Sequence, residues 1–277
     1  RMPRPTRPRV APPRAAPHRA GPPRAVTPAP PRDVVHGLRA GLAVIERRPG
    51  EVLTVACSGA VRQEVSGALA RARLAGVAVT VESDERLAQR AASKHHEGLV
   101  LEVRARRFLP IPDLGELLCS RSGTTVALDR VRNPYNVGAI LRTAAFFGVD
   151  AALLGAPAPH PALHPDAVRV AEGGAEHLAL ARTTDLAATL GRLRECGVTV
   201  IGAESKGGED AARFRFGRPT VLVLGHEREG LSTRVRAECS ALVCVRGRGG
   251  LDSLNVSVAA GVLVAALTAA PTDRRLP

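Results

Sequence analysis

The sequence predicts an α/β protein whose sheets are covered by helices. Short apolar runs such as 221–224 stop at a glycine, which is how buried parallel strands end before a sharp turn. Longer segments with a helical spacing of apolar residues alternate with these runs, as in α/β domains. Hydrophobic residues form 45% of the 277 residues and aromatic residues only 2%, so Ala, Val and Leu must do the packing.

Residues 1–32 are predicted to be a disordered or polyproline-like basic tail. They contain eight arginines, eleven prolines and no acidic residue. The net charge of the whole chain, +13, favours polyanionic partners, nucleic acid first. The tail could hold RNA phosphates without sequence preference, but a solubilising role fits its composition equally well.

Residues 33–107 are predicted to form a small α/β domain with a mainly parallel sheet. The expected helices span 34–47, 62–75 and 84–92, and the expected strands span 51–57, 77–83 and 99–103. A loop at 93–98 reads S-K-H-H-E-G. Because adjacent side chains rarely converge on one ion, we expect this loop to be solvated or to face RNA rather than to bind a metal.

Residues 108–122 are predicted to be an interdomain linker, since Pro110, Pro112, Gly115 and Gly123 are typical of irregular structure. Residues 123–277 are predicted to form a second α/β domain. Its expected strands lie near 124–130, 150–154, 198–203, 220–224 and 241–245, and its expected helices near 136–147, 185–196, 231–238 and 254–269. The absence of an early G-x-G-x-x-G argues against an ordinary dinucleotide site.

The cysteines argue against both a disulfide framework and a zinc site. They are five in number, at 57, 119, 196, 239 and 244, and include no C-x-x-C. We expect buried free thiols in a reducing cytosol, and no metal. The chain shows no secretory signal, and its apolar run 256–270 is too short for a bilayer, which needs about 20 residues. We therefore expect a cytoplasmic protein without a membrane span.

Two glycine-rich strand ends predict a ligand pocket. The strand at 221–224 is followed by Gly225, Glu227 and Gly230, and the strand at 241–245 is followed by R-G-R-G-G. A long apolar helix then begins near Ser253 or Asn255, either of which suits its cap. Ligands of open α/β sheets sit beyond the carboxyl ends of the strands. Many such strand–glycine–helix joints bind nothing, so this pattern alone leaves that alternative open.

A third segment identifies the family that the chain resembles. The set N-P-Y-N-V-G-A-I-L-R-T-A (133–144), L-G-H-E-R-E-G-L-S and S-L-N-V-S-V-A resembles the three ordered motifs of the SpoU (TrmH-like) RNA ribose methyltransferases of the SPOUT superfamily. The resemblance covers 33–270. It is closest to a poorly characterised bacterial branch related to the rRNA guanosine-2′-O-methyltransferases. One departure is V-R-G at 245–247, where most relatives have I-P-M.

The resemblance implies a fold and an assembly that composition does not show. It implies a carboxyl-terminal parallel sheet of SPOUT type with a trefoil knot, although knots are rare exceptions among folds. It also implies a small amino-terminal domain that helps to hold RNA. Relatives are homodimers whose active sites include residues of both subunits, so we expect a homodimer here.

The resemblance implies transfer of a methyl group from S-adenosyl-L-methionine to a ribose 2′-hydroxyl. The implied catalytic set is Asn136, Arg142, Glu227, Ser253 and Asn255. The implied donor-binding set is Leu224, Gly225, Val245 and Leu254. A sulfonium already activates the methyl group, so no metal is needed.

Relatives use the arginine matching Arg142 in catalysis, sometimes as a proposed base. Because a guanidinium has a pKa above about 12, we expect Arg142 instead to clamp an RNA phosphate and to favour the alkoxide electrostatically. Glu227 is expected to orient Arg142 or Asn136. We expect His226 to face solvent and His177 to be structural.

The leading interpretation is an RNA 2′-O-methyltransferase acting on rRNA, with large-subunit guanosine as the first choice and tRNA as the second. The alternative is a catalytically silent knotted RNA-binding or ribosome-assembly factor. The intact set of Asn136, Arg142, Glu227 and Asn255 argues against silence. Too few aromatic residues exist for a base-stacking module.

Overall fold

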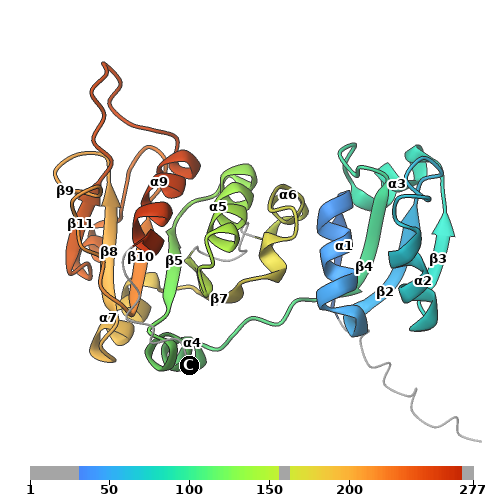
Figure 1. The fold of residues 1–277 in the computed structure, drawn as a ribbon, viewed down its shortest axis with the longest axis horizontal. Coiled ribbons are helices and arrows are strands. Elements are labelled where there is room, and N and C mark those ends of the chain that lie inside the picture. The colour runs from blue at the N-terminus through green and yellow to red at the C-terminus, as the bar shows by residue number, and fades with distance from the viewer. Residues whose placement is uncertain (1–30, 156–162, 270–277) are drawn as a thin grey trace, which may run out of the picture. The chain divides into compact units, whose positions relative to one another are not determined.

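The computed structural model describes residues 31–155 and 163–269, so the predicted basic tail lies outside the described residues except for its last two positions. The described chain contains a four-stranded sheet followed by a seven-stranded sheet, with helices packed on both (Figure 1). This is an α/β fold.

The four-stranded sheet is mixed, and the prediction of a mainly parallel sheet is wrong. Strand β4 runs antiparallel to both β1 and β2, and only β2 and β3 are parallel, in the order β1-β4-β2-β3. The elements of this part are β1 (Arg32–His36), α1 (Leu38–Arg47), η1 (Pro49–Glu51), β2 (Val52–Cys57), α2 (Ser66–Leu74), β3 (Ala78–Val81), α3 (Asp84–Ala91) and β4 (Leu99–Arg104).

The unpredicted strand of this sheet is β1, whose residues were assigned to a helix at 34–47. Gly37 has a φ of 101°, which only glycine adopts readily, and it turns the chain from β1 into α1. Five residues followed at once by a helix show too little alternation to be recognised as a strand. Its partner in the sheet is β4, which pairs with it in the antiparallel direction.

The stretch predicted to be a linker is mostly helix α4 (Ile111–Arg121). Pro110 is its N-cap and Pro112 lies in its first turn, where the missing N–H of proline costs no hydrogen bond. Leu114 and Leu118 are fully buried beneath the seven-stranded sheet. The prolines therefore start a helix instead of interrupting regular structure.

The seven-stranded sheet is parallel throughout, in the order β7-β6-β5-β10-β8-β11-β9. Its five predicted strands are present, whereas β7, β9 and α6 were not predicted. The elements are β5 (Thr124–Asp129), α5 (Pro134–Phe146), β6 (Ala151–Gly155), α6 (Pro165–Val170), η3 (Gly174–Glu176), β7 (Ala179–Thr183), α7 (Leu186–Glu195), β8 (Thr199–Glu204), β9 (Glu209–Asp210), β10 (Thr220–Leu224), α8 (Thr233–Ala237), β11 (Ala241–Cys244) and α9 (Val256–Ala269).

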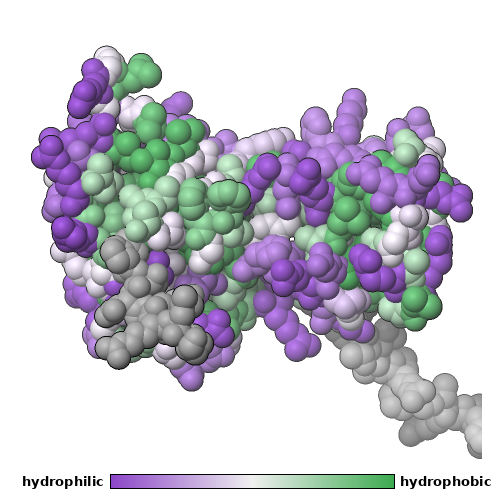
Figure 2. All heavy atoms as spheres, in the orientation of Figure 1, coloured by the Kyte–Doolittle hydropathy of each residue, from purple (hydrophilic) through white to green (hydrophobic). Residues whose placement is uncertain are grey.

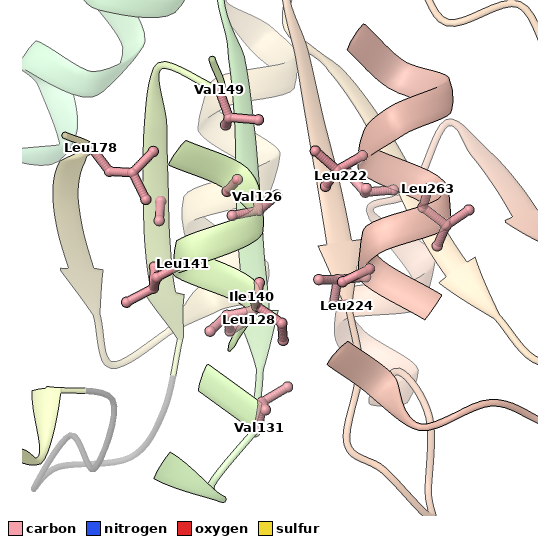
Figure 3. Packing of buried hydrophobic residues seen from close by; sticks show 14 of the residues in the cluster. Val126, Leu128, Val131, Ile140, Leu141, Val149, Leu178, Leu222, Leu224 and Leu263 are labelled. Atoms are coloured by element: carbon pink, nitrogen blue, oxygen red, sulfur yellow. The ribbon is translucent and has the colours of Figure 1, made fainter. Parts of the chain in front are cut away.

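Side chains of successive strand residues pack on opposite faces of this sheet. Val126 and Leu128 of β5 join the core under α5 and α9, while Ala127 between them joins the core under α4 and α7. Figure 3 shows the first of these cores, where Leu222 of β10 faces Leu263 of α9. Both faces are covered, as a parallel sheet requires.

The register of the parallel strands brings the predicted motifs to one edge. Leu224, the last residue of β10, pairs with Leu128 of β5, so Gly225 follows beside Asp129. Strand β11 ends at Cys244, on the other side of β8. The chain leaves β5 toward β6 and β7, whereas β10 and β8 lie on its other side. Such a change of direction opens a crevice at the carboxyl ends of strands.

The cysteines are free, but not all are buried as predicted. Cys119 and Cys196 are exposed, whereas Cys57 and Cys244 are buried. Burial raises the pKa of the Cys239 thiol to about 11, which keeps it protonated and unreactive at neutral pH. Among residues 31–155 and 163–269, no helix is long and apolar enough to cross a membrane.

Candidate active site

A side-chain network centred on Asn136 joins the three motif segments. Nδ2 of Asn136 donates to Oε1 of Glu227 at 2.8 Å, and Nδ2 of Asn255 donates to Oδ1 of Asn136 at 3.2 Å. Oδ1 of Asn255 accepts from the backbone N–H of Ser257 at 2.8 Å and from its hydroxyl at 2.6 Å. A single amide therefore connects α5, the loop after β10 and the start of α9.

The first turn of α5 presents Asn136 to this network. Asn133 is the N-cap, and its side chain accepts from the backbone N–H of Tyr135 at 3.0 Å, with Pro134 at the first helical position. Asn136 is only 9% exposed. A buried amide needs partners for both its donor and its acceptor, and Glu227 and Asn255 supply one each.

The loop after β10 depends on a close approach of its two ends. A Cβ added to Gly225 would lie 2.4 Å from the carbonyl carbon of Gly230 and 2.5 Å from the nitrogen of Leu231, so only glycine fits. His226 and Gly230 exchange backbone hydrogen bonds of 3.0 and 2.9 Å. Nδ1 of His226 accepts from the backbone N–H of Arg228 at 3.2 Å. His226 was predicted to face solvent; it is half-buried and stabilises the loop.

Two charged residues at the end of β5 hold the same loop. Buried Asp129 accepts from the backbone N–H of Ser232 at 2.6 Å, and Arg130 donates to the carbonyl of Gly230 at 3.1 Å. Arg130 also pairs with Glu229, and this hydrogen bond lowers the pKa of the Glu229 carboxyl. The loop that presents Glu227 is therefore attached to the end of β5 through the residues that follow Glu227.

Arg142 lies apart from the Asn136 network. Of the two partners expected for Glu227, only Asn136 bonds to it. Nη1 of Arg142 lies 2.8 Å from Oε1 of Glu172, a residue in the segment between α6 and β7. The side chain of Arg142 is 55% exposed, so it can reach a ligand from outside the sheet.

The third motif begins with a helix cap that Asn255 provides. Its Oδ1 accepts from the N–H of Ser257 in the first turn of α9, so Asn255, and not Ser253, fills the role that the sequence left open between them. Ser253 is exposed. Because both ends of the Asn255 amide are already bonded, it acts on the architecture of the site, whereas the hydroxyl of Ser253 is accessible to a ligand.

The segment between β11 and α9 suits S-adenosyl-L-methionine. Within the described chain, residues 246–254 make no backbone–backbone hydrogen bond, so their N–H and C=O groups can meet the polar edge of an adenine. A Cβ added to Gly247, Gly249 or Gly250 would meet nothing within 4 Å. Leu254 is 47% exposed, which leaves apolar surface for the donor. Of the predicted donor set, Leu254 lies in this segment, and its exposed side chain suits an apolar part of the donor.

Other predicted donor residues lie at the strand ends. Leu224 is buried at the end of β10, beside Gly225. Val245 follows β11 and packs half-buried against the core under α5 and α9. These side chains lie at the carboxyl edge of the sheet, and polar contacts with a ligand there would come from the loops.

The loop at 93–98 supports the fold of the small domain. The expectation of a solvated or RNA-facing loop is wrong at His96, whereas Lys94, His95 and Glu97 are exposed. His96 is buried, and its Nδ1 accepts from the N–H of Gly98 at 3.1 Å. Glu97 accepts from the N–H of Leu38, at the start of α1, at 3.0 Å. Among the described residues, no group of three His, Cys, Asp or Glu side chains is placed to hold a metal ion.

Four residues of the site escaped the sequence prediction: Asp129, Arg130, His226 in its loop-holding role, and Glu172. Asp129 lies at a strand end, which was a usable signal because a buried carboxylate needs donors nearby. Glu172 lies in the segment 171–177, in which only His177 was assigned a role from the sequence. Nδ1 of His177 in this segment lies 3.3 Å from Nη2 of Arg47, away from the Asn136 network.

Comparison with known proteins relates the chain to RNA methyltransferases. The family described as "SpoU rRNA Methylase family" matches residues 123–265. The chain is 34% identical over 233 residues to the 23S rRNA (guanosine-2′-O-)-methyltransferase RlmB of Yersinia pestis, covering 83% of this chain and 94% of that protein. It is 36% identical over 197 residues to RlmB of Ralstonia nicotianae, covering 70% and 78%.

Solved structures share the fold. An AdoMet-bound rRNA methyltransferase from Sinorhizobium meliloti matches with a TM-score of 0.69 at 24% identity, covering 85% of this chain and 86% of that one. The SpoU methyltransferase AviRb from Streptomyces viridochromogenes, in complex with AdoMet, also matches with a TM-score of 0.69, at 22% identity over 86% and 89% of the two chains. At these identities the likeness shows the α/β fold with its parallel sheet.

Gly225→Ala is expected to lower the free energy of unfolding by about 1–3 kcal/mol, because its Cβ would overlap the backbone of Gly230 and Leu231. Urea denaturation measures the change. Gly247→Ala is the control, since its Cβ meets nothing. If both variants are equally stable, the close approach at Gly225 does not constrain the loop.

Proposed function

Because the chain belongs to the SpoU rRNA methylase family, we propose that it transfers a methyl group from S-adenosyl-L-methionine to the 2′-hydroxyl of a guanosine ribose in large-subunit rRNA. The guanosine and the RNA class follow from the RlmB proteins, which are named as 23S rRNA (guanosine-2′-O-)-methyltransferases and match most of the chain. Transfer RNA is the second candidate substrate.

The observation that carries this proposal is the bonding of Asn136 to both Glu227 and Asn255. Each of the three residues comes from a different motif. A silent RNA-binding factor that kept only the fold would not need a buried amide with both its polar ends satisfied by the other two motifs. The network therefore favours an enzyme over the silent alternative.

S-adenosyl-L-methionine supplies a methyl group that its sulfonium has already activated. We assign its binding to Leu224, Gly225, Val245 and Leu254 together with the open backbone of 246–254. Leu254 and the partly exposed Val245 offer apolar surface, buried Leu224 and Gly225 support the strand end, and the loop offers hydrogen-bonding groups. Ser253 adds an accessible hydroxyl at the end of this loop. Holding the donor and the ribose in one geometry lowers the entropic part of the barrier.

Arg142 is assigned to the RNA side of the reaction. Its guanidinium can hold a phosphate through paired N–H donors, and its field favours the alkoxide that forms as the hydroxyl releases its proton to solvent water. Glu227 and Asn255 act through Asn136, which they hold in place. Glu227 does not reach Arg142, so its role is to orient the first turn of α5.

The RNA-binding surface is assigned to the small domain, residues 33–107, with the methyltransferase domain at 123–277. Arg62, Arg71 and Arg73 are exposed on or beside α2 and form no ion pair in the described chain, which leaves their charges available for phosphates. The basic tail would add affinity without sequence preference. A protein with rRNA as substrate works in the cytoplasm, where we place this one.

The proposal includes the trefoil knot and the homodimer that the family resemblance implies. The chain leaves β11 by the long segment 245–255 and then packs α9 against α5 and β10, a path that suits a knotted carboxyl-terminal segment. Val258 and Val262, one turn apart on α9, are 53% and 45% exposed, and Phe146 of α5 is 82% exposed. Figure 2 shows apolar side chains gathered over α9. An apolar face of this kind suits a second copy of the chain.

Transfer of labelled methyl from S-adenosyl-L-methionine to unmodified rRNA and tRNA pools tests the proposed function, followed by mapping of 2′-O-methyl sites. We expect label at one ribose of large-subunit rRNA. Label in tRNA alone would move the substrate to the second candidate. A folded protein that neither binds the donor nor labels RNA would establish the silent alternative.

Arg142→Ala is expected to keep the affinity for S-adenosyl-L-methionine and to abolish detectable transfer, because the guanidinium acts on the RNA and not on the donor. Calorimetry and the labelling assay measure the two quantities. Wild-type transfer by the variant would remove Arg142 from its role.

Val258→Asp combined with Val262→Asp is expected to convert a dimer into a monomer, since two carboxylates on one helix face cannot be buried without partners. Light scattering measures the mass of the variant and of the wild type at the same concentration. A dimer that survives the double substitution would place the interface elsewhere.

A further inference from the structure

Glu172 lies between Arg142 and the small domain. Its Oε1 is 2.8 Å from Nη1 of Arg142, and its Oε2 is 3.6 Å from Nε of Arg39 on α1. The Glu172 side chain is one-third exposed. In the described residues, Glu172 is the carboxylate within ion-pair distance of Arg142.

The backbone at Glu172 is in a conformation that favours glycine. Its φ is +45°, in the left-handed region, and it directly follows Ala171, the C-cap of α6. Glycine or asparagine is the usual residue in that conformation just after a helix, because a Cβ crowds the backbone there. A long acidic side chain in this strained backbone conformation indicates that its carboxylate has a function.

The segment that carries Glu172 is fixed against α5 at the level of Arg142. A Cβ added to Gly174 would lie 2.9 Å from Cα of Arg142, so the two backbones touch. Two residues further on, Glu176 is almost fully buried between Arg48, at 2.8 Å, and Arg106. Because both backbones are held, the Glu172 carboxylate has a defined place beside the Arg142 guanidinium.

We propose that Glu172 is a positioning residue for Arg142 in the methyl transfer. The inference rests on the proposed function and assigns a new part of its site. An arginine that is 55% exposed explores many rotamers, and one carboxylate at 2.8 Å limits this freedom. The guanidinium has five N–H donors, so the ion pair leaves others free for a phosphate. Glu172 thus presents the charge of Arg142 in one direction without touching the RNA or the donor.

Two substitutions separate this role from a structural one. Glu172→Gly removes the carboxylate and relieves the left-handed backbone, so the melting temperature is expected to stay or rise. Its kcat is expected to fall by up to about fivefold, the largest effect expected from loss of an exposed ion pair. Glu172→Gln keeps the shape and an acceptor oxygen, so its kcat is expected to lie between those of Glu172→Gly and the wild type. Affinity for S-adenosyl-L-methionine is expected to be unchanged in both.

Glu238→Gln is the matched control. Glu238 pairs with Arg194 at 3.1 Å, with side chains 27% and 48% exposed, compared with 33% and 55% for Glu172 and Arg142. The substitution removes a similar ion pair from the same domain, and the kcat of this variant is expected to equal that of the wild type.

Steady-state methyl transfer, donor calorimetry and thermal melting of the four proteins decide the matter. A wild type that transfers no methyl would overturn the proposed function and this inference together. An active wild type with unchanged or higher kcat in Glu172→Gly would overturn this inference alone. A fall of kcat matched by a lower melting temperature would assign Glu172 a structural role instead.

Discussion

The site depends on one buried amide. Asn136 donates to Glu227 and accepts from Asn255, and these bonds join segments 91 and 119 residues away along the chain. A buried amide that lost either partner would leave a polar group without a hydrogen bond, at a cost of about 1–3 kcal/mol. Separating the three motifs would therefore cost the free energy of an unsatisfied buried polar group, in addition to the loss of the hydrogen bonds themselves. A carboxylate partner strengthens the bond to Glu227 beyond that of a neutral acceptor.

The parallel sheet makes this amide possible because it delivers its strand ends to one edge. Gly225 lets the loop after β10 fold back against Gly230, and Asp129 attaches that loop to β5 through the N–H of Ser232. The loop can then present Glu227 to α5. Further along α5, Glu172 pairs with Arg142. The helix thus carries a fixed amide at its start and a charged group nearly two turns later, each held by a different part of the chain.

The sequence was sufficient to predict the features of the fold that local chemistry determines. Glycine after a short apolar run marked the end of β10, and the polar residues Ser253 and Asn255 before an apolar run marked the start of α9. Sequence-based prediction failed where long-range contacts decide: β4 pairs antiparallel with both β1 and β2, and α4 is a helix because Leu114 and Leu118 have a core to enter. The partner of Arg142 was also out of reach, since the family motif contains an acid, Glu227, that suggested a different pair. No local sequence pattern shows that Glu172, and not Glu227, lies beside Arg142.

The central claim is that the hydrogen bond between Asn136 and Glu227 organises the donor site, and exchanging the two chemical groups tests it directly. Asn136→Asp places two carboxylates face to face and is expected to weaken S-adenosyl-L-methionine binding about tenfold. Glu227→Gln alone keeps an acceptor and is expected to change little. The double variant restores an amide–carboxylate hydrogen bond, in which residue 227 now donates and residue 136 accepts. Calorimetry should therefore find an affinity for S-adenosyl-L-methionine within about threefold of that of the wild type. Wild-type affinity in Asn136→Asp, or a double variant that binds no better than Asn136→Asp, would contradict the account.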